Sequence, residues 1–164
     1  MPELRSVSPP RLLADEMVGR LARYLRILGC DTEYAHGWSD DEIVRRARLE
    51  DRVVLTRDRQ LSHRAAKAIL LTSSRLEDQV RAARAAFPDL PADVQFARCT
   101  LCNGSLDPYR PPAVSSLDEG VPWDRVGEGM PLYRCAECGH IYWEGSHTAA
   151  LRRRLRKWAA EGTP

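Results

Sequence analysis

Residues 11–29 read RLLADEMVGRLARYLRILG, and this stretch decides the fold that we expect. It predicts a short buried strand over residues 12–14 that ends on Asp15. A helix follows at once, because apolar residues recur at spacings of three and four: Met17, Val18, Leu21, Leu25 and Leu28. Gly29 suits a left-handed helix C-cap, and Arg20, Arg23 and Arg26 are expected on the other faces. A carboxylate therefore stands at the carboxyl end of a strand, where open α/β sheets bind their ligands.

Strand and helix patterns continue to alternate up to about residue 87. Further strands are predicted at 31–34, 53–55 and 68–71, and further helices from Ser39, around 60–66 and over 75–86. Ser39 with Glu42, and Ser74 with Glu77, have the spacing of capping boxes. This alternation predicts right-handed crossovers and a PIN-like α/β architecture, a parallel sheet flanked by helices.

Composition divides the chain into three parts. Residues 1–10 hold three prolines and little apolar content, which favours a flexible leader. Residues 11–90 carry the α/β pattern, which ends at the proline-containing stretch 87–91. Residues 91–164 are expected to form a small zinc ribbon followed by a basic C-terminal helix over 148–160, with Leu151, Leu155 and Trp158 on one face.

The chain has 164 residues, 43% of them hydrophobic and 29% charged, with a net charge of +2. No apolar run approaches the roughly 18–20 residues of a membrane helix, and the N-terminus lacks the apolar segment of a signal peptide. We therefore expect a cytoplasmic protein without a membrane partner. Lys67 and Lys157 are the only lysines. The arginine excess suits phosphate binding, although a codon bias toward arginine is the simpler explanation.

Carboxylates follow or open several of the predicted elements. Asp15 ends the first strand, Asp58 follows the third, and Asp40 and Asp41 open the helix between them. Asp40 continues the apolar stripe of its helix, whereas Asp41 is rotated about 100° toward water. Clustered carboxylates repel one another unless a cation lies among them. Mg²⁺ and Mn²⁺ prefer such oxygen ligands, and one or two of these ions support in-line phosphoryl displacement.

Local structure offers another explanation for some of these acids. Asp40 and Asp41 also suit the positive end of a helix dipole, and Asp58 suits a helix N-cap. Asp15, which follows a buried strand, is harder to explain by local structure.

Cys99 with Cys102 and Cys135 with Cys138 form two Cys-x-x-Cys turns, each followed closely by glycine. Four thiolates in this spacing are typical of a closed structural zinc site, which leaves no position open for catalysis. A rubredoxin-like iron centre and a redox pair remain alternatives. The fifth cysteine, Cys30, is expected to behave as a small core hydrophobe.

Arginines near the acids and in the C-terminal helix are candidates for binding a nucleic-acid backbone: Arg20, Arg23, Arg57, Arg152 and Arg153. Each of them also suits an ordinary solvated surface. Tyr142 and Trp143 either stack on bases or belong to the core of the ribbon. His147 suits hydrogen bonding or RNA contact better than metal ligation.

Three motifs together carry a family resemblance. LADEMVGRLARYLRILG, SDDEIV and RVVLTRDRQL, with the zinc-ribbon cysteines and the closing YWEGSH at residues 142–147, resemble the PIN-like ribonuclease domain first described at the C-terminus of the Mut-seven exonucleases. The resemblance spans about residues 11–158. It implies a metal-dependent ribonuclease in which Asp15, Asp58, and Asp40 or Asp41 are the active-site acids. PIN enzymes commonly use four acids, and Glu16 and Asp41 are the best local candidates for the fourth.

The sequence therefore predicts a Mg²⁺- or Mn²⁺-dependent ribonuclease that cleaves RNA endonucleolytically, with tRNA as one candidate substrate. Asp15 and Asp58 are expected to bind the catalytic ion and Asp40 to complete the site. Two rivals stay open: a non-catalytic RNA-binding module with the same fold, and a phosphatase acting on small phosphate esters. Regulation by an inhibitory protein partner is a further open point, as is the oligomeric state.

Overall fold

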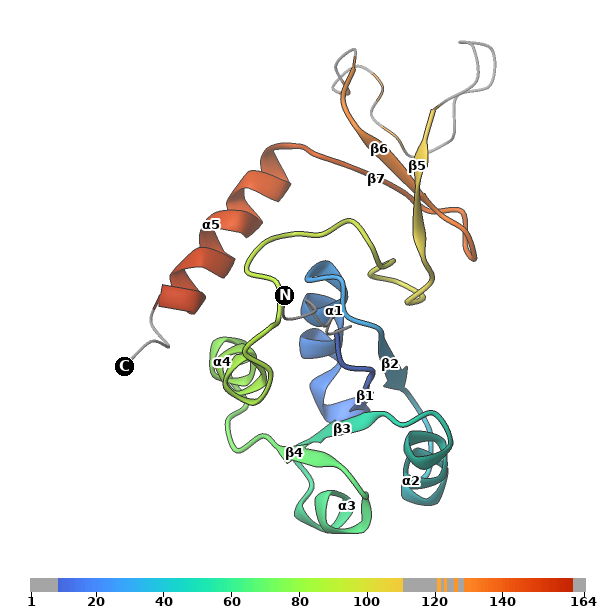
Figure 1. The fold of residues 1–164 in the computed structure, drawn as a ribbon, viewed down its shortest axis with the longest axis vertical. Coiled ribbons are helices and arrows are strands. Elements are labelled where there is room, and N and C mark those ends of the chain that lie inside the picture. The colour runs from blue at the N-terminus through green and yellow to red at the C-terminus, as the bar shows by residue number, and fades with distance from the viewer. Residues whose placement is uncertain (1–8, 111–120, 122, 124–125, 127–128, 161–164) are drawn as a thin grey trace, which may run out of the picture.

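The computed structural model describes residues 9–110, 121, 123, 126 and 129–160, so the predicted leader lies almost wholly outside the described residues. The first part of the chain alternates strand and helix (Figure 1). Its elements are β1 (Leu12–Asp15), the 3₁₀ helix η1 (Glu16–Val18), α1 (Gly19–Ile27), β2 (Thr32–Ala35), α2 (Asp40–Leu49), β3 (Val53–Thr56), α3 (Arg59–Arg64), β4 (Ala68–Leu70) and α4 (Leu76–Ala86). The second part contains β5 (Leu106–Tyr109), β6 (Leu132–Cys135), β7 (Ile141–Trp143) and α5 (Ser146–Ala160).

The first four strands form one parallel sheet in the order β2-β1-β3-β4. Helices α1 and α4 cover one face of it, and α2 and α3 cover the other (Figure 1). Cover on both faces explains why every residue of β1 is buried. The predicted α/β class with a helix-flanked parallel sheet is confirmed. The carboxyl ends of all four strands lie at the same end of the sheet. We call this end the acidic edge because Asp15 and Asp58 lie there.

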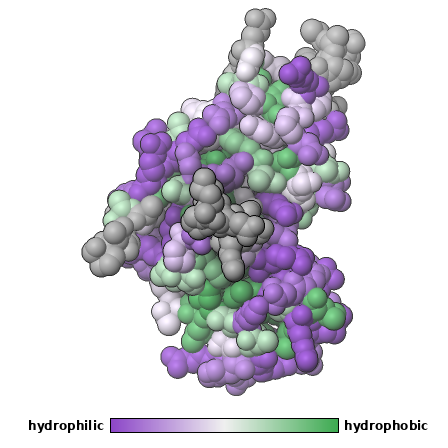
Figure 2. All heavy atoms as spheres, viewed as in Figure 1, coloured by the Kyte–Doolittle hydropathy of each residue, from purple (hydrophilic) through white to green (hydrophobic). Residues whose placement is uncertain are grey.

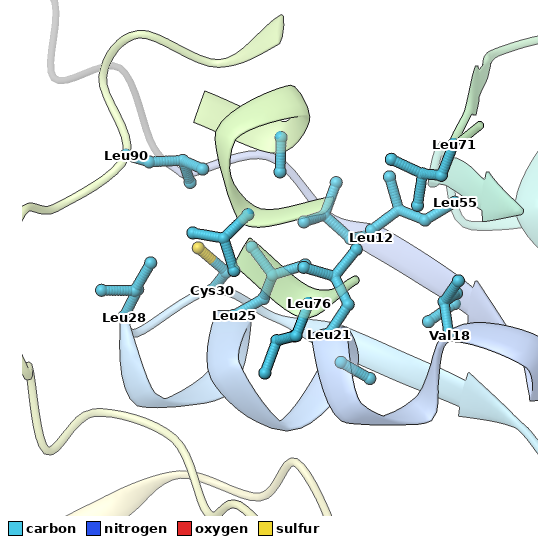
Figure 3. Packing of buried hydrophobic residues seen from close by; sticks show 14 of the residues in the cluster. Leu12, Val18, Leu21, Leu25, Leu28, Cys30, Leu55, Leu71, Leu76 and Leu90 are labelled. Carbon is cyan, nitrogen blue, oxygen red and sulfur yellow. The ribbon is translucent and has the colours of Figure 1, made fainter. Parts of the chain in front are cut away.

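The larger hydrophobic cluster fills the space between the sheet, α1 and α4 (Figure 3). Leu21, Leu25 and Leu28 supply the α1 side of it, and Cys30 is fully buried among them. Burial raises the pKa of the Cys30 thiol to about 12, as expected for a core residue. Figure 2 shows that hydrophilic residues cover most of the face in view, with hydrophobic patches between them.

Helix α5 returns from the second part of the chain to pack on this same cluster. Leu155 is fully buried and Trp158 nearly so, and both belong to the cluster beside α4. The ring of Trp158 also lies 5.4 Å from that of Tyr24 on α1. The predicted apolar face of the C-terminal helix is therefore an anchor into the α/β core.

Strands β5, β6 and β7 form a separate antiparallel sheet in sequence order. Cys135 ends β6, and the turn that follows it contains Cys138 and leads into β7. This sheet and the four cysteines agree with a zinc ribbon. Among the helices that the structure describes, none has the length and apolar character needed to cross a bilayer.

Three local details differ from the sequence expectation. Met17 is 54% exposed, because the first turn is a 3₁₀ helix whose tighter winding moves it off the buried stripe. Arg26 is buried rather than solvated. The box expected from Ser74 does not form. Instead, the Ser73 hydroxyl accepts a hydrogen bond from the Arg75 N–H and donates one to Asp78.

Candidate active site and metal centre

Asp15 ends β1 at the acidic edge, and its side chain is almost completely buried. Its Oδ1 accepts a hydrogen bond of 2.8 Å from the Met17 N–H, which caps η1, and its Oδ2 accepts one from the Thr56 hydroxyl. Burial raises the pKa of the Asp15 carboxyl, and the nearby charge of Asp58 acts in the same direction, against the lowering effect of the hydrogen bonds. Asp15 is thus a desolvated carboxyl held in a fixed orientation.

Asp58 reaches the same edge from the neighbouring strand β3. Thr56 links the two acids, because its hydroxyl donates to Asp15 and accepts a 2.8 Å hydrogen bond from the Asp58 N–H. Asp58 Oδ1 caps α3 by accepting from the N–H groups of Gln60 and Leu61 at 2.6 and 3.1 Å. The local explanation for Asp58 as an N-cap therefore holds, and its Oδ2 takes part in neither of these bonds. Neither acid forms an ion pair with any described residue.

The other predicted acids lie apart from this pair. Asp40 and Asp41 stand in the first turn of α2, and both pair with Arg64 of α3. Their side chains are 45% and 88% exposed, in the order that the helical rotation predicts. Glu16 is exposed in η1. Within the described residues, no three acidic side chains come close enough together to form a metal-binding group. The structure therefore groups Asp15 with Asp58 only.

The predicted substrate-binding arginines differ in how they are engaged. Arg20 and Arg23 are exposed on α1, and each lines a groove that begins at Glu16 and Met17 beside the acidic edge. Arg20 and the exposed Arg153 of α5 line a second groove next to it. Together these side chains form a positively charged surface along α1.

Two arginines of the set also have structural contacts. Arg152 pairs with Asp93 and Glu144 at 3.0 and 2.8 Å, and thereby connects α5 to the segments on either side of the ribbon. Arg57 gives its backbone N–H to Asp15, while its side-chain Nε is buried with no hydrogen-bond partner in the described part of the chain.

The sulfur atoms of Cys99, Cys102, Cys135 and Cys138 all lie within 4.8 Å of one another. Gly104 makes this approach possible, since a Cβ there would lie 2.9 Å from the sulfur of Cys135. Burial opposes ionisation of Cys99, but hydrogen bonds from the Tyr142 hydroxyl and from backbone N–H groups lower its pKa to about 6. The cluster can hold a structural metal such as zinc, and it includes no histidine.

Arg26 joins this centre to the α/β part, a role that the sequence pattern missed. Its Nε donates to the Thr32 carbonyl at 2.8 Å, and its Nη1 donates to the carbonyls of Thr100 and Leu101 at 3.2 and 3.1 Å. Burial lowers the pKa of the Arg26 guanidinium, and the negative charges of Cys99 and Cys102 oppose this effect. No local signal reveals such a residue, because two of its partners lie 74 and 75 positions further along the chain.

A second link from the same knuckle reinforces the first. The Thr32 N–H donates to the Asn103 side chain at 2.9 Å, and the amide of Asn103 donates to Asp31 at 2.7 Å. Asn103 has φ +68°, a conformation that asparagine tolerates better than most residues. The first cysteine knuckle is thus docked on the amino end of β2, at the end of the sheet opposite the acidic edge.

The family model of the Mut7-C RNAse domain matches residues 10–155 of this chain. Comparison with curated proteins and with solved structures found no match. The matched range runs from β1 through both cysteine knuckles and into α5, so it reaches every element of the fold described above. With nearly the whole chain covered, the protein belongs to the Mut7-C RNase domain family.

Proposed function

We propose that this protein is a Mg²⁺- or Mn²⁺-dependent endoribonuclease that cleaves RNA phosphodiesters at the acidic edge, with tRNA among the substrates to be tested. Membership of the Mut7-C RNase domain family supports a ribonuclease-type activity with RNA as substrate. The metal dependence, the endonucleolytic mode and the roles of the individual acids are our inference from the site.

One observation carries the proposal: Asp15 is buried beside Asp58 without a basic partner among the described residues. Asp31 and Glu50, by contrast, pair with Arg52, and Asp40 pairs with Arg64. Burial and the neighbouring charge of Asp58 both raise the pKa of Asp15, and a cation bound between the two acids would relieve this unfavourable environment. Mg²⁺ commonly uses one or two protein carboxylates together with water and substrate phosphate oxygens, so the donor set fits. When bound, such an ion activates water and stabilises the charge of an in-line phosphoryl displacement.

The residues of the chain would then orient and hold the substrate. Thr56 fixes the Asp15 carboxylate through its hydroxyl, and Asp58 is fixed by capping α3. Arg20 and Arg23 would bind phosphates of the strand near the cleaved bond, because they line the groove that begins at Glu16 and Met17, the two residues after Asp15. Arg57 is expected to act at the same edge and Arg153 further along the strand. Asp40 and Asp41 remain the proposed additional acids, reached by releasing Arg64.

We further propose zinc as the ion of the four-cysteine cluster and the cytoplasm as the location. Both rest on the chemistry of thiolates, which favour zinc in tetrahedral groups of four and must stay reduced to bind it.

The proposal is tested with zinc-loaded full-length protein and a circular RNA, which only an endonuclease can open. Wild-type protein should cleave it with added Mn²⁺ or Mg²⁺ and not without. Asp15→Asn and Asp58→Asn should each lower the rate at least about a hundredfold. Asp58→Asn should fold, because one amide oxygen can accept both N-cap bonds and asparagine is as good an N-cap as aspartate. Asp15→Asn should also fold, because its amide oxygen can accept from the Met17 N–H and its amide N–H can donate to the Thr56 hydroxyl.

Asp51→Asn is the matched control. Asp51 is exposed, pairs with Lys67 and has φ +52°, a conformation that asparagine adopts readily. Asp40→Asn and Asp41→Asn ask separately whether either acid contributes to catalysis. RNA binding without cleavage under all these conditions would refute the proposal in favour of a binding module. Cleavage of small phosphate esters alone would favour a phosphatase.

A further inference from the structure

A cavity of about 360 Å³ lies between the ribbon, the carboxyl-terminal half of α1 and the start of α5. Rings of Phe96, Tyr142 and Trp143 line it from the ribbon side, Ile27 lines it from α1, and His147 lines it from α5. Its volume falls in the usual range for small-ligand sites. It is separate from the acidic edge, and the activity proposed above assigns it no role.

The aromatic walls of this cavity are held in place by neighbouring groups. The Tyr142 hydroxyl accepts a 3.0 Å hydrogen bond from the Thr100 N–H and lies 3.1 Å from the sulfur of Cys99. Trp143 meets His147 edge to face, with ring centres 5.7 Å apart. Gly145 permits this arrangement, since a Cβ there would lie 3.0 Å from the His147 ring.

Phe96 adds a second sign of a built site. Its φ is +44°, which is unusual for a bulky residue, and its ring stacks on Tyr133 at 4.7 Å. Backbone strain of this kind is concentrated at ligand-binding sites, where the surrounding structure enforces it.

Arginines give the cavity its positive charge. Arg98 lines it and donates a hydrogen bond to the Asn103 carbonyl. Arg23 lines both this cavity and the groove that begins at Met17 beside Asp15. Arg23 stands four positions after Gly19, the first residue of α1, roughly 6 Å along a helix at 1.5 Å per residue. The surface from the acidic edge to the cavity is therefore short and continuous along α1.

We propose that this cavity binds one nucleotide of the RNA strand, with the base against the aromatic walls and the phosphate at Arg23. Aromatic side chains combined with arginine are the usual means of binding single-stranded nucleic acid. A purely apolar ligand would leave the arginines without a function. The proposal rests on RNA being the substrate, as proposed above, and adds a site that selects where the strand is held.

The test is titration calorimetry on the zinc-loaded full-length protein with the four nucleoside 5′-monophosphates, and with ribose 5-phosphate as a ligand without a base. We expect at least one nucleotide to bind and ribose phosphate not to bind. Trp143→Leu should weaken nucleotide binding by about tenfold or more, the usual effect of losing one base–aromatic stack. His147→Ala should weaken it severalfold, which keeps the test valid if Trp143→Leu does not fold.

Matched controls separate the cavity from the rest of the molecule. Arg23→Gln should weaken binding, whereas Arg45→Gln, an exposed site on α2, should not. Equal binding of ribose phosphate, or unchanged nucleotide binding in both Trp143→Leu and His147→Ala, would overturn the proposal. So would an apolar dye that occupies the cavity and is not displaced by any nucleotide.

The outcome is distinguishable from that for the proposed function. Nucleotide binding that is lost in Trp143→Leu supports the cavity even if no RNA is cleaved. In an active protein, Trp143→Leu should raise KM for RNA and leave kcat nearly unchanged, whereas Asp15→Asn should abolish cleavage and leave nucleotide binding intact. Cleavage with normal KM in Trp143→Leu would refute the cavity alone.

Discussion

Replacement of Arg26 by methionine tests whether the ribbon is held to the α/β core by one buried guanidinium. The side chain is 6% exposed and donates to three carbonyl oxygens, one on β2 and two in the first cysteine knuckle. Methionine matches the apolar stem of arginine but carries no donor, so the three acceptors lose this partner.

The magnitude follows from those three bonds. Hydrogen bonds to a charged group each contribute roughly 1.5–3 kcal/mol, and a buried acceptor left unsatisfied costs about 1–3 kcal/mol. Part of this cost is offset, because the variant buries an apolar side chain and no longer has to bury a charge. We therefore expect a net loss of about 2–4 kcal/mol in the free energy of unfolding. That is a large share of the roughly 5–15 kcal/mol typical of a folded domain.

Urea unfolding of the zinc-loaded protein measures this loss, and hydrogen exchange locates it. Amides of Thr100, Leu101 and Asn103 should lose protection before those of β1. The matched control is Arg45→Met on the exposed face of α2, which should change stability by less than about 0.5 kcal/mol. If Arg26→Met lies within that same margin, the reasoning from buried carbonyls is wrong.

Three further perturbations follow from the same structure. Because burial raises the pKa of Asp15 above its ordinary value of 3.8, ionisation of this group disfavours the folded state increasingly as pH rises through the raised pKa. Asp15→Asn should therefore be more stable than wild type in thermal unfolding at pH 7 without added Mg²⁺, and should lose that advantage below about pH 4. Leu155→Ala should cost about 2–5 kcal/mol in urea unfolding, since Leu155 is fully buried in the α/β core; a cost below 1 kcal/mol would mean that α5 is only loosely attached. Cys102→Ser should release the metal ion, measured as zinc per chain, and should deprotect β6 in hydrogen exchange before β1; an unchanged metal content would refute the four-thiolate site.

The sequence predicted the features that depend on local pattern. Periodicity placed the α/β elements to within one or two residues. Gly29 lies just after α1 and has φ +83°, the left-handed conformation expected of a glycine at a helix C-terminus. Cysteine spacing predicted the four-thiolate cluster because each Cys-x-x-Cys turn is recognisable within a few residues of sequence. Position after a strand brought Asp15 and Asp58 to one edge because parallel strands share their carboxyl ends.

Features that depend on distant partners escaped prediction. Arg26 was expected in solvent and is buried, because its guanidinium donates hydrogen bonds to carbonyls of the first cysteine knuckle. Met17 was expected in the core and is exposed, because it lies in a 3₁₀ turn. Arg152 was predicted to contact substrate, and its ion pairs with Asp93 and Glu144 come from the tertiary fold. The aromatic cavity is likewise formed by segments that are far apart in the chain, so no single stretch of sequence predicts it.

The return of α5 to the core gives the cysteine cluster a role in the entropy of folding. The chain between α4 and α5 must close a long loop before Leu155 can reach its place, and the cost of closure rises with the logarithm of loop length. A metal ion bound by both Cys99 and Cys138 would exclude most of that loop from the length of chain that must be closed. Reducing the effective length about threefold would lower the closure cost by roughly 1 kcal/mol. The metal centre would then stabilise a helix that it does not touch.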